Sequence, residues 1–198
     1  MRIGSTEHYK HSWIADKLLP DFKIEDVWQL PVTLQKVHTL QQFHNAFASS
    51  SNSLETSGFT GMLFRFRLFV GRLFKWDNKL PQTALVPGSI RARYAQMEAL
   101  KYDQLPDPGN GSFTPVYNLD QEFLAEIVNA TVHAAIHLGL VPLDENTFTV
   151  QMTIYVKPKG TFGKGYMLLI KPFRWLIVYP TLMRIIRKKW KGYVISSK

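Results

Sequence analysis

The sequence predicts an α+β protein organised around one long C-terminal helix. The longest apolar segment of the chain lies between Lys157 and Lys191, and it exceeds the roughly 4–8 residues of a typical buried strand. Residues 147–157 are rich in β-branched and aromatic side chains and end before a proline, which predicts a strand. The 198 residues are 45% hydrophobic, so the chain is most simply one domain, 1–198, with a substantial core.

Glycines and prolines divide the predicted C-terminal helix. Gly160, Gly163 and Gly165 predict a flexible turn before it, and Lys and Arg crowd its last turns, where cations suit the helix dipole. Pro172 and Pro180 lie inside, and each removes a backbone donor. In a straight helix, with about 100° per residue, the cations before and after Pro180 would lie on nearly opposite sides. We therefore expect a kink or break near Pro180 that separates a helix of about four turns from a shorter basic one.

A membrane-spanning helix is the alternative for residues 166–183. Their length suits a bilayer, but they contain Lys171, Arg174 and two prolines, and a central cation is costly in lipid. We therefore favour a buried core helix. The basic end, 184–198, is either a solvated helix end or a segment that lies on an anionic membrane surface. Its candidate membrane or anion contacts are Arg184, Arg187, Lys188, Lys189 and Lys191.

Positive charge is concentrated near the C-terminus. The net charge is +9, yet residues 1–145 hold thirteen bases against fifteen acids, and no acid follows Glu145. This polarity suggests an anionic ligand or a membrane face, or it has no specific function. We expect no nucleic-acid partner, because no aromatic and basic strand motif of the RNA-binding kind is present.

The absence of cysteine excludes disulfides, thiolate zinc sites and cysteine nucleophiles. The first residues have no apolar run of the signal-peptide type. We therefore expect a cytoplasmic protein, with a peripheral membrane location as the alternative if the basic end binds lipid. No cofactor is predicted.

The first part of the chain predicts one strand and two helices. Residues 11–20 suggest a short helical lead-in, and residues 22–30 alternate and stop before a proline, as a first strand would. Apolar residues recur at helical spacing over 34–48, and 59–74 predict an almost wholly apolar helix that requires partners on several sides. The Ser-rich segment 48–58 predicts a loop between them.

The middle of the chain is harder to assign. Residues 89–99 predict a short helix capped by Ser89, and 113–117 predict a strand. Residues 120–141 fit a helix from Asp120 to Gly139 and fit alternating strands equally well. Periodicity alone leaves both alternatives open.

Three short segments carry a recognisable pattern. PKGTFGKGY (158–166) is followed by PFR (172–174), EIVNATVH (126–133) runs on to His-Leu-Gly, and DVWQLP occupies 26–31. Together they resemble a bacterial domain family of unknown function within the START/polyketide-cyclase, or helix-grip, superfamily. The likeness covers most of the chain, although the Ser-rich loop and 77–112 match little.

The resemblance implies an antiparallel β-sheet curled around a long C-terminal helix, with two helices inserted after the first strand. It therefore favours strands for 121–129 and 131–141. Helix-grip proteins commonly hold an apolar ligand between sheet and C-terminal helix, in keeping with pockets that are mostly apolar and concave. The family lends no established activity.

The ionisable residues give no strong indication of catalysis or metal binding. On a strand, His133 and His137 would lie about 13 Å apart, too far to share a metal ion. We expect one of them to face solvent or a polar patch of the cavity, and we expect Glu122 and Glu126 to be solvated. Arg174 is predicted either to grip a ligand's carboxylate or phosphate, or to pair with Glu126.

We expect a non-enzymatic protein that binds a small apolar or amphipathic molecule between sheet and C-terminal helix. The alternatives are a peripheral membrane or protein-interaction module that uses the basic end, and a cyclase-like or dehydratase-like enzyme, for which fold alone is no evidence. No catalytic or metal-binding residue is assigned. The candidate ligand contacts are Arg174, Tyr166, His133, His137, Trp175, Phe66 and Trp28, with Trp13 as a further wall.

Overall fold

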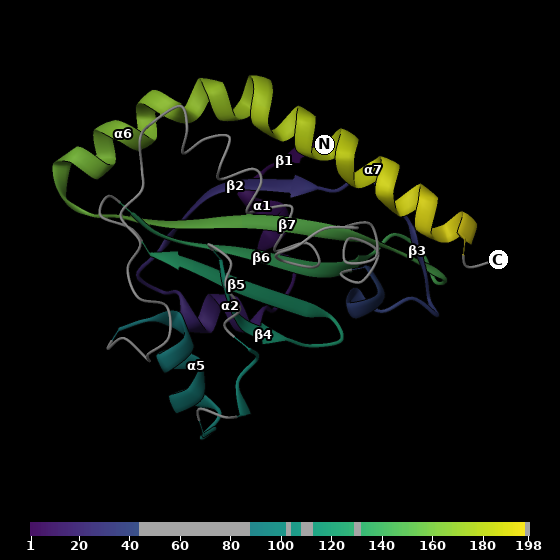
Figure 1. Cartoon of the computed structure of the whole chain (residues 1–198), viewed down its shortest axis with the longest axis horizontal. Coiled ribbons are helices and arrows are strands. Elements are labelled where there is room, and N and C mark those ends of the chain that lie inside the picture. The colour runs from purple at the N-terminus through teal and green to yellow at the C-terminus, as the bar shows by residue number, and fades with distance from the viewer. Residues whose placement is uncertain (44–87, 102–103, 108–112, 129–131, 197–198) are drawn as a thin grey trace.

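The computed structural model describes residues 1–43, 88–101, 104–107, 113–128 and 132–196. A seven-stranded antiparallel sheet curls beneath a long C-terminal helix that lies along one side of it (Figure 1). The strand order is β1-β2-β7-β6-β5-β4, and β3 also pairs with β7. The predicted fold class is therefore confirmed. The strands are β1 (Arg2–Ile3), β2 (Lys23–Gln29), β3 (Leu34–Gln35), β4 (Thr114–Asn118), β5 (Glu122–Val128), β6 (Val132–Pro142) and β7 (Thr147–Pro158).

Strands β4 to β7 follow one another in both sequence and sheet. β6 pairs along its whole length with β7 and along most of it with β5, so its backbone groups are bonded on both sides. These pairings show that 122–128 and 132–141 form strands and not the alternative helix. Asp144 forms the turn into β7, since its carboxylate accepts hydrogen bonds from the backbone N–H groups of Asn146 and Thr147.

The N-terminal part differs from the prediction in three places. A short strand, β1, pairs with β2 and precedes the strand that was predicted to be the first. Two short helices, α1 (Ser5–His8) and α2 (Ile14–Leu18), precede the first long strand, whereas one lead-in was expected. Residues 34–35 are strand β3, paired with β7, and helix begins only at Leu40. The predicted helix start at residue 34 is therefore wrong. Thr39 and Gln42 exchange side-chain and backbone hydrogen bonds at the true start, a capping box that the sequence contains.

Helix α5 (Ile90–Met97) begins as predicted, because the Ser89 hydroxyl accepts a hydrogen bond from the Ala92 N–H at 3.1 Å. The predicted helix at 59–74, the Ser-rich loop and the end of the helix that begins at Leu40 lie outside the described residues.

The C-terminal helix is continuous and comprises α6 (Gly160–Phe173), the π-helical segment η2 (Arg174–Val178) and α7 (Tyr179–Ser196). It begins at Gly160, whose φ of 65° favours glycine, and not after the third glycine. The expected break is replaced by η2, in which the Tyr179 N–H donates to the Arg174 carbonyl five residues earlier. A π turn accommodates Pro180, which has no N–H for the carbonyl four residues before it. The expectation of a shorter second helix is also wrong, since α7 has 18 residues and α6 has 14.

The π segment keeps both ends of this helix turned toward the sheet. Met167 and Trp190 are both buried, although about 100° per residue would place them about 140° apart around a straight helix. The wider turn of η2 offsets most of this rotation. A straight α-helix would have placed the cations before and after Pro180 on nearly opposite sides. The rotation at η2 removes the need for the break in the helix that this arrangement predicted.

The sheet has two covered faces, which we call the helix face and the rear face. The helix face packs against η2 and α7 through Val178, Tyr179, Leu182, Ile186 and Trp190. The rear face packs against the N-terminal segment and α5, through residues that include Trp13, Leu18 and Tyr94. Alternation along each strand sends neighbouring side chains to opposite faces.

Candidate functional site

The residues predicted to contact a ligand lie on both faces of the sheet. His133 and His137 of β6 point to the rear face, where they contact Phe22 and Trp13. Trp28 and Trp175 pack with the core of the helix face. The structure therefore separates the two histidines from the tryptophans that were expected to share a site with them.

Two further candidates fall where the structure gives no account of them. Tyr166 belongs to α6, but its side chain is not among those described, and Phe66 lies wholly outside the described residues.

Asp26 organises the polar part of the helix face. Ile24 packs on the rear face, and a register shift in β2 between Ile24 and Asp26 lets Asp26 face the opposite way. The buried Asp26 carboxylate accepts hydrogen bonds from Trp175 Nε1 and Tyr179 OH, both at 2.9 Å. Arg174 Nη2 lies 3.6 Å from it. Burial and the nearby Asp26 charge raise the pKa of Tyr179 well above its ordinary value, so its phenol remains a donor.

Two buried donors beside this cluster have no acceptor among the described residues. They are Arg174 Nε and Trp28 Nε1. Arg174 donates through Nη2 to Glu25 Oε1 at 2.7 Å, so its acidic partners are Glu25 and Asp26. The alternative pairing of Arg174 with Glu126 is wrong, because Glu126 lies on the rear face.

The rear face carries two diagonal Glu–His pairs. Glu122 Oε2 lies 3.3 Å from His137 Nε2, and Glu126 Oε2 lies 2.8 Å from His133 Nε2. Each glutamate on β5 is two positions from the residue directly opposite its histidine on β6, so the two pairs repeat the same geometry. All four side chains are buried, and the expectation that the glutamates are solvated is therefore wrong.

Both glutamates also hold a covering element against the sheet. Glu122 accepts hydrogen bonds from the N–H of Ile14, at the start of α2, and from Tyr117 OH. Glu126 accepts from the N–H groups of Ile90 and Arg91, at the start of α5. A carboxylate suits a helix N-terminus, where backbone donors are free. The two carboxylates therefore stabilise the packing of α2 and α5 against the sheet.

Their pKa values follow from the same contacts. Burial lowers the pKa of His137, although the hydrogen bond and charge of Glu122 oppose this. Burial alone would raise the pKa of Glu122, but His137, the Ile14 N–H and Tyr117 together hold it below its ordinary value. His137 Nδ1 has no partner within the described part of the chain.

A third histidine extends this polar layer and was missed from the sequence. His8 Nδ1 lies 3.0 Å from Gln151 Oε1 and 2.9 Å from Thr153 Oγ1. His8 Nε2 lies 3.0 Å from Asp16 Oδ1 and 2.7 Å from Tyr155 OH. No pattern in the N-terminal segment indicates this role, which depends on contacts with β7. Within the described ranges, no three His, Asp or Glu residues are arranged to hold a metal ion.

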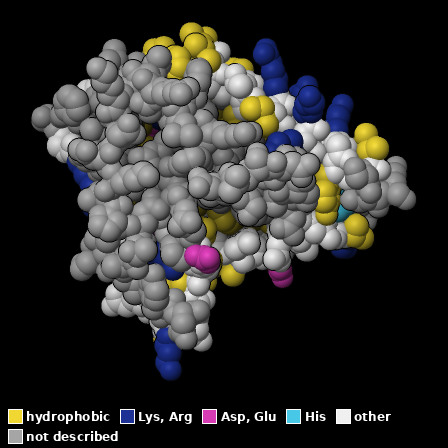
Figure 2. Space-filling view, viewed as in Figure 1, with side chains coloured by type: hydrophobic (Ala, Val, Ile, Leu, Met, Phe, Trp, Pro, Cys, Tyr) yellow, Lys and Arg dark blue, Asp and Glu magenta, His cyan; other side chains and the backbone are white. Residues whose placement is uncertain are grey.

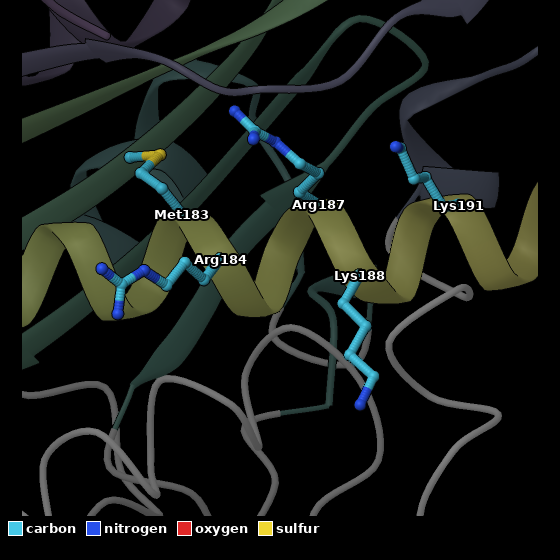
Figure 3. A pocket seen from close by; sticks show the side chains of 5 residues that line it. All are labelled: Met183, Arg184, Arg187, Lys188 and Lys191. Atoms are coloured by element: carbon cyan, nitrogen blue, oxygen red, sulfur yellow. The ribbon is translucent and has the colours of Figure 1, made fainter.

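The cations of α7 occupy a different surface. Arg184, Arg187, Lys188 and Lys191 are exposed, and with Met183 they line a groove of about 500 Å³ (Figure 3). No carboxylate in the described ranges forms an ion pair with any of these four, whereas the other predicted contact, Lys189, has an interaction of its own. None of the described helices combines the length and apolar character needed to cross a membrane.

Comparison with known proteins identifies a family. Residues 18–181 match the family described as "Protein of unknown function (DUF2867)". No curated protein and no solved structure gives a significant match. The match spans most of the chain, from α2 to the start of α7, and therefore includes the sheet and η2. The chain belongs to the DUF2867 family.

Proposed function

We propose that the protein binds a small amphipathic molecule between the helix face of the sheet and η2. One observation carries the proposal. Arg174 Nε and Trp28 Nε1 are buried donors in this region, and no described group accepts a hydrogen bond from either. A ligand oxygen would supply the hydrogen-bond acceptor that these two N–H groups lack.

The energetic argument rests on the cost of unsatisfied donors. A buried N–H without an acceptor costs about 1–3 kcal/mol, and native proteins contain few of them. Here both belong to residues that the sequence analysis selected as ligand contacts, on the sheet face that the helix-grip resemblance implies. An acceptor on a bound molecule would recover this free energy on binding.

The surrounding side chains suit the apolar part of such a ligand. The rings of Trp28 and Tyr179 lie 4.5 Å apart between centroids, and the Arg2 guanidinium lies 3.9 Å from the Trp175 ring centre. Trp175 belongs to η2, and π-helical segments frequently occur at functional sites. These features support a site with aromatic walls and a few polar groups.

We expect the ligand to present a neutral oxygen, such as a carbonyl or hydroxyl. Arg174 already pairs with Glu25 and lies near Asp26, so a ligand carboxylate or phosphate would approach two existing carboxylates. We therefore replace the carboxylate or phosphate that was expected at Arg174 with a neutral ligand oxygen. Catalysis of the cyclase or dehydratase kind remains the second alternative to this non-enzymatic proposal.

The test combines native mass spectrometry with dye titration. The full chain should retain a small molecule after purification, or bind Nile red, a neutral apolar dye with a ring carbonyl. Trp28→Phe removes one donor and Arg174→Lys removes the other while keeping a positive charge near Glu25. Each should weaken dye binding about tenfold, the effect of losing one good hydrogen bond.

Trp13→Phe is the matched control. Trp13 lies on the rear face and its Nε1 already donates to the His8 carbonyl at 3.2 Å, so its replacement should leave dye affinity unchanged. Trp28→Phe breaks no described hydrogen bond, since Nε1 donates to no described acceptor, and its stability cost is that of the lost ring packing against Tyr179. If wild-type protein neither retains a molecule nor binds the dye, or if both helix-face variants bind like wild type, the proposal is wrong.

A further inference from the structure

One side of α7 combines exposed cations with exposed apolar side chains. Leu182, Ile186 and Trp190 face the core, and the residues on the other side of the helix recur at helical spacing. We call this second set the outer face. Its members on α7 are Thr181, Arg184, Ile185, Lys188, Lys191 and Ile195, and Ile177 of η2 extends the same face; all are exposed.

Within the part of the chain that the structure describes, the cations of the outer face have no carboxylate partner, in contrast to four cations on other elements. Lys157, Lys171, Arg93 and Arg174 each pair with an aspartate or glutamate. No carboxylate among the described residues pairs with Arg184, Lys188 or Lys191, and no acidic residue follows Glu145 in the sequence. Arg184 and Lys188 lie four residues apart, a spacing at which like charges destabilise a helix. An anion from outside the protein would relieve this repulsion.

The groove beside these cations gives such an anion a place. In Figure 3, Arg187 and Lys191 point to one side of α7 and Arg184 and Lys188 to the other, with the groove of about 500 Å³ lined by both rows and Met183. Arg pairs with phosphate through two parallel hydrogen bonds, and Lys acts as a point charge. The surface therefore fits several phosphate groups better than one isolated ion.

The apolar members decide which kind of phosphate-bearing partner is favoured. Ile195 is 75% exposed, and Ile177 and Ile185 are 45% and 38% exposed. Figure 2 shows hydrophobic side chains beside the Lys and Arg side chains along the upper right rim, where α7 runs. Water contact with these isoleucines is unfavourable, and a lipid surface would remove it. A single-stranded nucleic acid would instead require stacking aromatics, and Trp190 is buried in the core.

We infer that the outer face of α7 docks on the surface of an anionic phospholipid bilayer, with the helix lying in the plane of the interface. The cations bind headgroup phosphates, and the isoleucines enter the boundary between headgroups and acyl chains. This goes beyond the proposed ligand site and does not depend on it, because the two use opposite sides of the C-terminal helix.

Co-sedimentation with vesicles tests the inference. The full chain should sediment with vesicles of phosphatidylcholine and phosphatidylglycerol, stay in solution with phosphatidylcholine alone, and lose binding as salt is added. Arg184→Glu/Lys188→Glu should weaken binding at least tenfold, because each cation contributes about 1 kcal/mol near such a surface. Ile185→Ser/Ile195→Ser keeps the charge and should also weaken binding.

The matched control is Lys17→Glu/Lys101→Glu, which changes net charge equally at exposed positions away from α7. It should bind vesicles almost as wild type does. All substituted positions are exposed, and circular dichroism will verify folding. Equal losses in the control and α7 variants, or no preference of wild type for anionic vesicles, would overturn the inference. Tighter binding to single-stranded RNA, insensitive to the Ile substitutions, would also overturn it.

Nile red binding should be unchanged in the Arg184→Glu/Lys188→Glu variant, which separates this test from that of the ligand site.

Discussion

The two faces of the sheet use polar side chains in opposite ways. On the rear face, the side chains of buried Glu122, Glu126 and His8 have partners, and their hydrogen bonds join the covering elements to the sheet. Among the described residues of this face, His137 Nδ1 alone is a buried polar side-chain atom without a partner. On the helix face, the polar groups gather around Asp26, and Trp28 Nε1 and Arg174 Nε lack acceptors among the described residues. A nearly complete set of partners that joins covering elements to the sheet indicates a structural role, whereas two unpartnered donors beside aromatic rings indicate room for a ligand.

The largest expected effect tests the structural role of the rear face. Glu126→Ala leaves His133 and the first N–H groups of α5 without their shared acceptor. Removing one partner of a buried, hydrogen-bonded pair should lower the free energy of unfolding by about 3–5 kcal/mol. Urea denaturation measures this loss. Glu98→Ala, at an exposed position after α5, is the control and should cost less than about 0.5 kcal/mol. If Glu126→Ala lowers the free energy of unfolding by less than about 1 kcal/mol, the structural role assigned to the rear face is wrong.

An intermediate effect tests the packing of the N-terminal segment. A Cβ added to Gly139 would lie 2.5 Å from a carbon of the Trp13 ring, which packs directly on the β6 backbone. Gly139→Ala should therefore destabilise the protein by about 1–3 kcal/mol through overpacking. Gly192→Ala is the matched control, because nothing lies within 4 Å of its added Cβ. In helix α7 that change should stabilise slightly. In thermal unfolding, we expect a lower Tm for Gly139→Ala and a slightly higher Tm for Gly192→Ala. An unchanged Tm for Gly139→Ala would show that Trp13 does not pack on Gly139.

The smallest effect concerns pH. The folded pKa of His137 lies below the ordinary value of 6.5, so the unfolded chain takes up a proton that the folded protein resists. Stability should therefore fall as pH decreases from about 6.5 toward the lower folded pKa of His137. The folded pKa of Glu122 lies below 4.5, so its contribution is present above that pH and is lost as pH falls through the folded pKa.

Two variants separate these pH ranges. His137→Gln should flatten the upper part of the stability profile, and Glu122→Gln should flatten the lower part. Urea unfolding at a series of pH values measures both. An unchanged upper slope in His137→Gln would assign the pH dependence to another group.

The sequence alone determined the elements whose causes are local. The β-branched run at 147–157 became β7, Ser89 capped α5, and the long apolar segment became the C-terminal helix. It also placed all the excess positive charge after Glu145, and α7 displays part of that charge on its exposed side. In each case neighbouring residues supply the physical cause, namely propensity, capping or periodicity.

Tertiary structure alone decided which residues share a site. Periodicity could not choose strand for 120–141, because the decisive hydrogen bonds join β6 to β5 and β7. It could not show that Glu122 and Glu126 are buried, since their partners come from α2, α5 and β6. Nor could it separate His137 from Trp28, because a register shift in β2 and the pairing of distant strands set which face each side chain takes. Burial and partner choice depend on contacts between distant segments, and no local pattern records those contacts.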